Sequence, residues 1–204
     1  FGQAKRALAV QRNVSLSDYI HSVATGPQRR RELLTPLGLL IFAVTLAAVI
    51  VGGLYTDRWI GLPALLPGTL GVAGGVAFLT AGSLLSGWCV VLFRKARGVP
   101  VPVNPPRELI VSGPYAWVRN PMLTGVFSML FGLGLLVHSP GIALIWTPAY
   151  VLVQLVELKR IEEPDLALRF GSAYAEYRSQ VPMFIPRLTR YRGRSASASR
   201  SEGS

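Results

Sequence analysis

The chain is short of charged residues. Asp, Glu, Lys and Arg make up only 15% of its 204 residues, and half of the residues are hydrophobic. A soluble domain usually carries about 25% charged residues. One cysteine, Cys89, excludes an intrachain disulfide, and one cysteine with two histidines is too few for a zinc or iron–sulfur site. The composition therefore indicates a membrane protein, and we expect no metal site.

Three long stretches have no charged residue at all: 33–56, 59–93 and 120–156. A helix needs about 20 apolar residues to cross a bilayer. The first stretch predicts a span over 34–55, and the second predicts one over 69–93 after a loop rich in Gly and Pro. The third contains His-Ser-Pro-Gly at 138–141, a turn signal, so we expect a hairpin of two spans there. The predicted fold is an all-α bundle of about four transmembrane helices.

The positive charges are distributed unevenly along this arrangement. The net charge is +11, and with four spans 20 of the 21 Lys and Arg residues fall on the side of the two termini, leaving Arg58 alone on the other. The positive-inside rule places that side in the cytoplasm. We therefore expect both termini to be cytoplasmic, and we expect the basic residues to face membrane lipids and not nucleic acid.

Four regions follow from this distribution. Residues 1–31 form a basic segment that could lie on the membrane surface. Residues 32–93 hold two spans, and residues 94–190 hold a loop, the hairpin and an amphipathic helix. The low-complexity end, 191–204, is predicted to be a disordered tail.

Acidic residues gather just after the hairpin. Five of the ten lie in the 20 residues from 157 to 176, and Glu162 and Glu163 directly precede Pro164, which suits the first turn of a new helix. Aromatic side chains then recur at helical spacing, at Phe170, Tyr174 and Tyr177, and could roof a pocket. A solvated amphipathic helix with ordinary Glu–Arg pairs is the alternative interpretation.

The loop before the hairpin has the complementary chemistry. Tyr115, Trp117 and Arg119 could form an interfacial belt. The start of the next span near Asn120 also suits an anion, and Arg119 could bind a carboxylate. Because a hairpin brings its two ends together, the loop and Glu162–Glu163 should meet on the cytoplasmic side. They would form a pocket whose glutamates accept hydrogen bonds from ribose hydroxyls or an amino group.

Two stretches carry a family resemblance. ELIVSGPYAWVRNPMLTG (108–125), followed by a membrane hairpin and EEPDLALRFGSAYAEYRSQVPMFIPR (162–187), resembles the isoprenylcysteine carboxyl methyltransferase family and its phospholipid methyltransferase relatives. The match runs from about Arg107 to Arg187, roughly 40% of the chain. The resemblance implies an integral membrane enzyme that holds S-adenosylmethionine in a cytosolic pocket. It also implies a lipophilic or prenylated acceptor that enters from the bilayer.

The resemblance carries roles onto individual positions. Arg119, Glu162 and Glu163 would form the catalytic polar cluster. Asn120 stands where the family often has His, and Leu123 where it has Tyr. Leu158 stands where a basic residue is expected to meet a substrate carboxylate, which leaves the adjacent Lys159 and Arg160 as candidate substrate-binding residues. The implied cofactor contacts are Arg107, Glu108, Leu109, Ile110, Tyr115, Asn120, Pro121, Met122, Leu123 and Glu162.

Several activities remain open at this point. The pattern is most like isoprenylcysteine carboxyl O-methylation, with phospholipid N-methylation and thiol S-methylation as alternatives. Two readings come from other classes: a membrane NADPH-dependent reductase of the sterol-reductase type, and a non-enzymatic membrane protein whose polar cluster anchors the spans.

Overall fold

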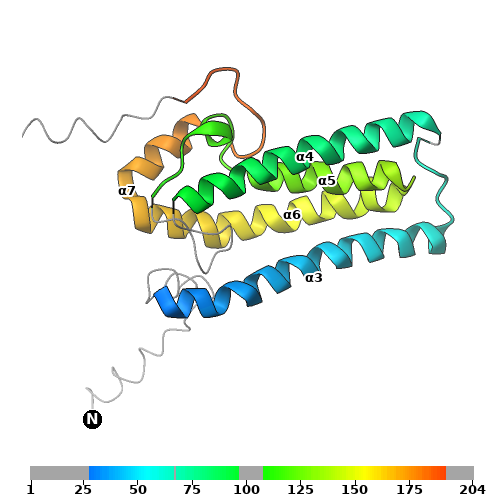
Figure 1. The fold of residues 1–204 in the computed structure, drawn as a ribbon, viewed down its shortest axis with the longest axis horizontal. Helices are drawn as coiled ribbons and strands as arrows, with labels where there is room; N and C mark the ends of the chain where they lie inside the picture. Colours follow the sequence, from blue (N-terminus) through cyan, green and yellow to red (C-terminus); the bar gives the residue numbers. More distant parts are fainter. Residues whose placement is uncertain (1–27, 67, 97–107, 192–204) are drawn as a thin grey trace, which may run out of the picture.

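The computed structural model describes residues 28–66, 68–96 and 108–191 (Figure 1). Within these ranges the chain is helical and has no strand, which confirms the predicted all-α class. The α-helices are α3 (Gln28–Ile60), α4 (Thr69–Lys95), α5 (Pro121–Leu136), α6 (Thr147–Glu157) and α7 (Glu163–Gln180). A 3₁₀ turn, η1 (Gly113–Ala116), and two π-helical segments, η2 (Gly141–Trp146) and η3 (Leu158–Glu162), join them.

Three helical stretches are long and apolar enough to cross a membrane: Leu33–Ile60 in α3, the whole of α4, and the continuous run Gly141–Gln180. These confirm a polytopic membrane bundle. Helix α5 is apolar but has only 16 residues, which at about 1.5 Å per residue is shorter than the hydrocarbon core. The count of four crossings therefore stays a prediction, as does the side on which the termini lie.

The first helix is longer than its apolar stretch predicts. It begins at Gln28 and ends at Ile60, whereas the sequence indicates a span over 34–55. Its last turn continues through Asp57, whose carboxylate accepts hydrogen bonds from the backbone N–H of Gly141 (2.7 Å) and from the hydroxyl of Ser139. Of the predicted surface segment 1–31, residues 1–27 lie outside the described residues and residues 28–31 belong to the first turn of α3. Of the predicted tail 191–204, residues 192–204 lie outside them as well.

Helices α4 and α5 are packed backbone against backbone. A Cβ atom at Gly132 would lie 2.8 Å from the Leu79 nitrogen and 2.9 Å from the Gly75 oxygen. Small residues of this kind let helices approach closely in lipid, where apolar burial does not drive association. The hydroxyl of Ser128 crosses the same interface and donates to the Phe78 carbonyl at 2.9 Å.

The predicted hairpin is present, but its second arm differs from expectation. Helices α5 and α6 run back along each other (Figure 1). The sequence predicts a fresh helix at Pro164, yet η3 joins α6 to α7 without a break. Proline removes a backbone donor inside a helix, and the wider π turn just before it accommodates that loss. Helix α7 itself bends at Gly171, where φ is 51°.

The glycine contact between α4 and α5 can be tested by substitution. We expect Gly132→Leu to lower the thermal midpoint of the purified protein in detergent, because the new side chain must displace the α4 backbone. Overpacking of this kind costs about 1–3 kcal/mol. Gly87→Leu is the matched control, because Gly87 lies on α4 with no other group within 4 Å of its missing Cβ. Equal midpoints for the two variants would contradict the close packing.

Candidate active site

A cavity lies at the end of the bundle where the 108–120 loop, η3 and α7 meet. Its volume is ≈ 120 Å³. Aromatic and aliphatic side chains form most of its wall, and the acidic and basic ones come from the loop and from the start of α7. It is lined by Phe93, Glu108, Leu109, Ile110, Tyr115, Arg119, Asn120, Leu158, Ile161, Glu162, Glu163, Asp165, Leu166, Arg169, Phe170, Tyr174 and Tyr177.

The 108–120 loop is fixed by the C-terminal segment, residues 181–191. The backbone N–H groups of Arg119 and Asn120 donate to the carbonyls of Pro182 (2.9 Å) and Met183 (3.1 Å). In the other direction, the N–H of Tyr191 donates to Ala116 at 2.9 Å. The C-terminal segment thus supplies hydrogen-bond partners for backbone groups of the loop that are not part of a helix or strand. Tyr191 is buried, so the packed core extends past the predicted boundary at 190.

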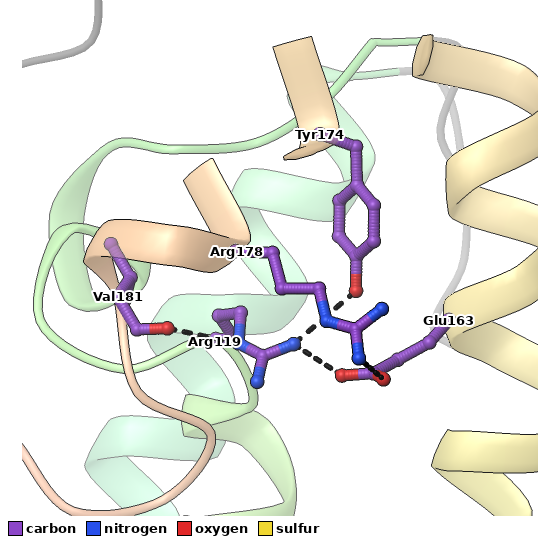
Figure 2. A network of polar contacts seen from close by, with 5 residues as sticks. All are labelled: Arg119, Glu163, Tyr174, Arg178 and Val181. Carbon is purple, nitrogen blue, oxygen red and sulfur yellow. Dashed lines mark hydrogen bonds and ion pairs between the residues drawn. The ribbon is translucent and has the colours of Figure 1, made fainter. Parts of the chain in front are cut away.

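Arg119 and Glu163 form a buried ion pair that joins the loop to α7 (Figure 2). Their side chains are only 13% and 8% exposed. The Arg119 Nε also donates to the Val181 carbonyl at 2.9 Å, and Nη1 lies 3.4 Å from the Tyr174 hydroxyl. The second carboxylate oxygen of Glu163 faces Arg178 at 3.3 Å. Charge-assisted hydrogen bonds of this type fix geometry as well as contributing energy.

Glu162 differs from its neighbour. Its side chain lines the cavity, and within the described ranges it makes no hydrogen bond or ion pair. Residues 157–180 carry nine charged side chains, too many for a bilayer span, so this part of the helix lies outside the membrane. Burial raises the pKa of Glu162 to about 7, with further increases from Glu157, Asp165 and Glu163 and a smaller opposing effect of Arg169.

The cavity wall is net acidic. Among the described lining residues there are four carboxylates and two guanidiniums, which gives a formal charge of −2. Both guanidiniums are paired: Arg119 with Glu163, and Arg169 with Asp165 at 3.3 Å. The charges left over are the carboxylates of Glu108 and Glu162. The wall therefore offers negative charge to a ligand, next to aromatic surfaces.

The structure brings together part of the predicted site. Glu108, Leu109, Ile110, Tyr115, Asn120 and Glu162 line the cavity, as do Arg119 and Glu163. Pro121, Met122 and Leu123 do not line it, because they form the first turn of α5. Lys159 and Arg160 are exposed and absent from its wall. Arg107 lies outside the described residues. The functional roles assigned to these residues stay predictions.

Other lining residues were not identified from sequence as site residues. They are Phe93, Leu158, Ile161, Asp165, Leu166 and Arg169. The helical spacing of Phe170, Tyr174 and Tyr177 did indicate a face that could roof a pocket, and all three line the cavity. Asp165 and Arg169 are four residues apart, a spacing that also suits a plain surface pair. The spacing alone therefore does not tell a pair that lines a cavity from a pair on the surface.

The sequence of this region matches a known protein family. Residues 70–173 match the model of the phospholipid methyltransferase family, which is half of the chain. The chain therefore belongs to the phospholipid methyltransferase family. The matched region contains α4, the 108–120 loop, the hairpin and the first half of α7.

The chain is similar to two metal-resistance proteins and, over a shorter stretch, to a methyltransferase. The chain is 31% identical over 159 residues to the cobalt-zinc-cadmium resistance protein CzcN of Cupriavidus metallidurans. It is 29% identical over 157 residues to the nickel-cobalt-cadmium resistance protein NccN of Alcaligenes xylosoxydans xylosoxydans. Each match covers 76% of this chain, and the chain spans only 65% and 66% of the two relatives. Over 74 residues, 36% of the chain and 27% of the relative, it is 34% identical to methanethiol S-methyltransferase 2 of Bradyrhizobium diazoefficiens.

A solved structure also resembles the chain. It is that of the eukaryotic intramembrane Ras methyltransferase ICMT, isoprenylcysteine carboxyl methyltransferase. The TM-score is 0.49 at 20% sequence identity, over 91% of this chain and 61% of that one.

The Arg119–Glu163 pair should be needed for a stable fold. We expect Arg119→Met to destabilise the protein by about 3–5 kcal/mol, because it leaves a buried carboxylate without its main partner. Adding Glu163→Met should recover part of that loss, since two apolar side chains avoid the unpaired charge. Thermal unfolding in detergent measures both. An Arg119→Met variant as stable as the parent would show that the pair does not fix the loop.

Glu162 should make stability depend on pH. Its pKa is about 7 in the folded chain against 4.5 ordinarily, so between these values the folded state retains a proton that the unfolded state has lost. Stability then falls as pH rises through this window. We expect the thermal midpoint to fall less for Glu162→Gln than for the parent between about pH 5 and pH 8. Glu176→Gln, on the exposed side of α7, should behave like the parent.

Proposed function

We propose that the protein is an S-adenosylmethionine-dependent membrane methyltransferase that acts on a lipophilic acceptor. The observation that carries this is the acidic, aromatic-walled cavity at the end of a membrane bundle. Membership of the phospholipid methyltransferase family supports the same class. The apolar part of the wall, including Phe93, Leu158 and Ile161, suits an acceptor with a hydrocarbon body.

The residues present fit this cofactor. S-adenosylmethionine carries a sulfonium, an ammonium and one carboxylate, so its net positive charge complements a wall of −2. Glu108 can meet the cationic end, and Asn120 offers an amide that both donates and accepts hydrogen bonds. Leu109, Ile110 and Tyr115 supply apolar surface for the adenine. When bound, the cofactor supplies an electrophilic methyl group, and the protein aligns the acceptor and excludes water.

The charges of the cavity wall also argue against the two alternative functions, an NADPH-dependent reductase and a non-enzymatic membrane protein. A nicotinamide dinucleotide phosphate is strongly anionic, and the two guanidiniums among the described lining residues are already paired with carboxylates. A purely structural cluster would not require Glu162 to line the cavity without a hydrogen-bond or ion-pair partner among the described residues, whereas a cationic ligand would use such a carboxylate.

The acceptor is a separate question. Isoprenylcysteine carboxyl methylation requires a group that meets the acceptor's carboxylate. Leu158 lines the cavity where the family pattern expects a basic residue, while Lys159 and Arg160 are outside its wall. Phospholipid N-methylation and thiol S-methylation need no such cation. A carboxyl acceptor therefore stays a prediction that the charge of the wall does not favour.

Cofactor binding tests the proposal. We expect S-adenosylhomocysteine to raise the thermal midpoint of the purified chain, as any ligand of the folded state does, and NADPH to leave it unchanged. Glu108→Gln should weaken S-adenosylhomocysteine binding by about tenfold, the loss of one charge-assisted contact. Glu176→Gln, with the same change outside the cavity, should bind normally. Stabilisation by NADPH instead of S-adenosylhomocysteine would overturn the assignment.

A further inference from the structure

The C-terminal segment, residues 181–191, lies against the membrane bundle as well as against the loop. It leaves the end of α7 and returns to the start of α5 (Figure 1). The ring of Phe184 packs on the ring of Phe127 in α5, with 5.6 Å between their centroids. Phe127 is six residues beyond the first residue of α5, Pro121, which is about 9 Å along the helix axis. Phe184 therefore lies alongside the first two turns of an apolar helix.

Two large apolar side chains of this segment are turned away from the described protein. Ile185 is 79% exposed and Leu188 is 98% exposed. Most other large apolar side chains that are exposed lie on the membrane helices. The loop adds Trp117, which is 39% exposed and whose carbonyl accepts the N–H of Arg187 at 3.2 Å. Apolar side chains cost free energy in water, and tryptophan is enriched at membrane interfaces.

The charges of the segment complement this apolar pair. Arg187 and Arg190 flank Leu188, and neither forms an ion pair with a carboxylate in the described ranges. Arg187 donates instead to the Gln180 carbonyl at 2.7 Å and to the Thr189 hydroxyl at 3.0 Å, which fixes its guanidinium within the segment. Basic side chains beside apolar ones are typical of segments that lie in the interface of an anionic bilayer.

The residues that follow are too polar to cover the apolar pair. Residues 192–204 read RGRSASASRSEGS, in which the largest apolar side chain is that of alanine. They carry three arginines and one glutamate, so their net charge has the same sign as that of Arg187 and Arg190. A bilayer surface with anionic headgroups matches both the exposed apolar pair and this positive charge.

We propose that the C-terminal segment inserts its apolar pair, Ile185 and Leu188, into the bilayer surface on the side where the cavity lies. The guanidiniums of Arg187 and Arg190 then face anionic headgroups. Because the same segment accepts hydrogen bonds from the loop at 119–120, the bilayer holds in place the loop that lines the cavity. This membrane contact goes beyond the methyl transfer proposed above and does not depend on it.

A spin label at position 188 tests the insertion. Cys89 is the one cysteine of the sequence and is 0% exposed, so the label attaches to Leu188→Cys, and the parent is the unlabelled control. The full chain is placed in bilayer discs made of equal parts of phosphatidylcholine and phosphatidylglycerol. We expect this label to collide more often with oxygen, which dissolves in lipid, than with a water-soluble nickel complex. A label at Leu152→Cys on α6 should behave in the same way, and one at Ser172→Cys, exposed on α7, should show the reverse.

The headgroup contact is tested by changing the lipid and the arginines. Discs without phosphatidylglycerol should lower the ratio of oxygen to nickel collisions at Leu188→Cys at least about twofold, because the electrostatic attraction is lost. Combining Arg187→Gln with Arg190→Gln should have the same effect in the mixed discs. Arg58→Gln, in the last turn of α3, is the matched control and should leave the ratio unchanged.

The effect on the loop is measured by hydrogen exchange in the mixed discs. The amides of Arg119 and Asn120 donate to this segment. We expect both to exchange at least about tenfold faster when Ile185→Ser and Leu188→Ser are combined than in the parent, because a less stable segment opens more often. Leu168→Ser, which changes a 72% exposed leucine on α7, should exchange like the parent.

Three results would contradict the proposal. A label at position 188 that meets the nickel complex as freely as the one at Ser172→Cys would show that the segment lies in water. A label shielded from both reagents would show that protein, such as a second copy of the chain, covers the apolar pair. Unchanged exchange of the two loop amides in the double serine variant would show that the bilayer does not hold the loop. All three leave S-adenosylhomocysteine binding, the test of the proposed activity, to be judged separately.

Discussion

The ion pair between Arg119 and Glu163 is the constraint on which the cavity depends. It connects the 108–120 loop, in which the described regular structure is the short turn η1, to the first turn of α7, 44 residues further along the chain. Both charges are buried, so neither can leave the other without a large desolvation penalty. That penalty fixes the distance between the two walls. It also removes both charges from the chemistry that the cavity can offer to a ligand.

The two adjacent glutamates therefore have different roles in the structure. Glu163 is neutralised by Arg119 and Arg178, while Glu162 faces the cavity without a partner among the described residues. Both glutamates line the cavity, and the π segment η3 ends between them, so they differ in their partners and not in the cavity that they face. A carboxylate that stays unpaired beside apolar side chains is poised to exchange a proton near neutral pH, whereas a paired one is not.

Much of this arrangement could be predicted from sequence. Charge-free runs predicted the long helices. The Pro and Gly of His-Ser-Pro-Gly at 138–141 predicted the hairpin turn, and the hairpin placed Arg119 beside Glu163. The π turn could not be predicted, because Leu158 to Glu162 read equally well as α-helix or as a break before Pro164. The C-terminal segment was also missed, since its hydrogen bonds to the loop are backbone to backbone and leave no side-chain signature. Met122 and Leu123 were predicted to contact the cofactor, but they do not line the cavity. The motif gives their position in the sequence and not the direction in which α5 turns their side chains.

The C-terminal segment has a consequence for how the protein is made. Residues 182–191 pair with residues 116–120, so two parts of the chain that are synthesised far apart in time must meet. Helices α4 and α5 can pack as soon as the hairpin has been inserted, because their contact involves nothing downstream. The loop, by contrast, makes hydrogen bonds within itself, but the backbone groups of Ala116, Arg119 and Asn120 gain their partners in the C-terminal segment only when residues 182–191 have been synthesised. Contacts of such long range form late in folding. Helices α4 and α5 can thus pack first, and the cavity closes only after residues 182–191 have been synthesised.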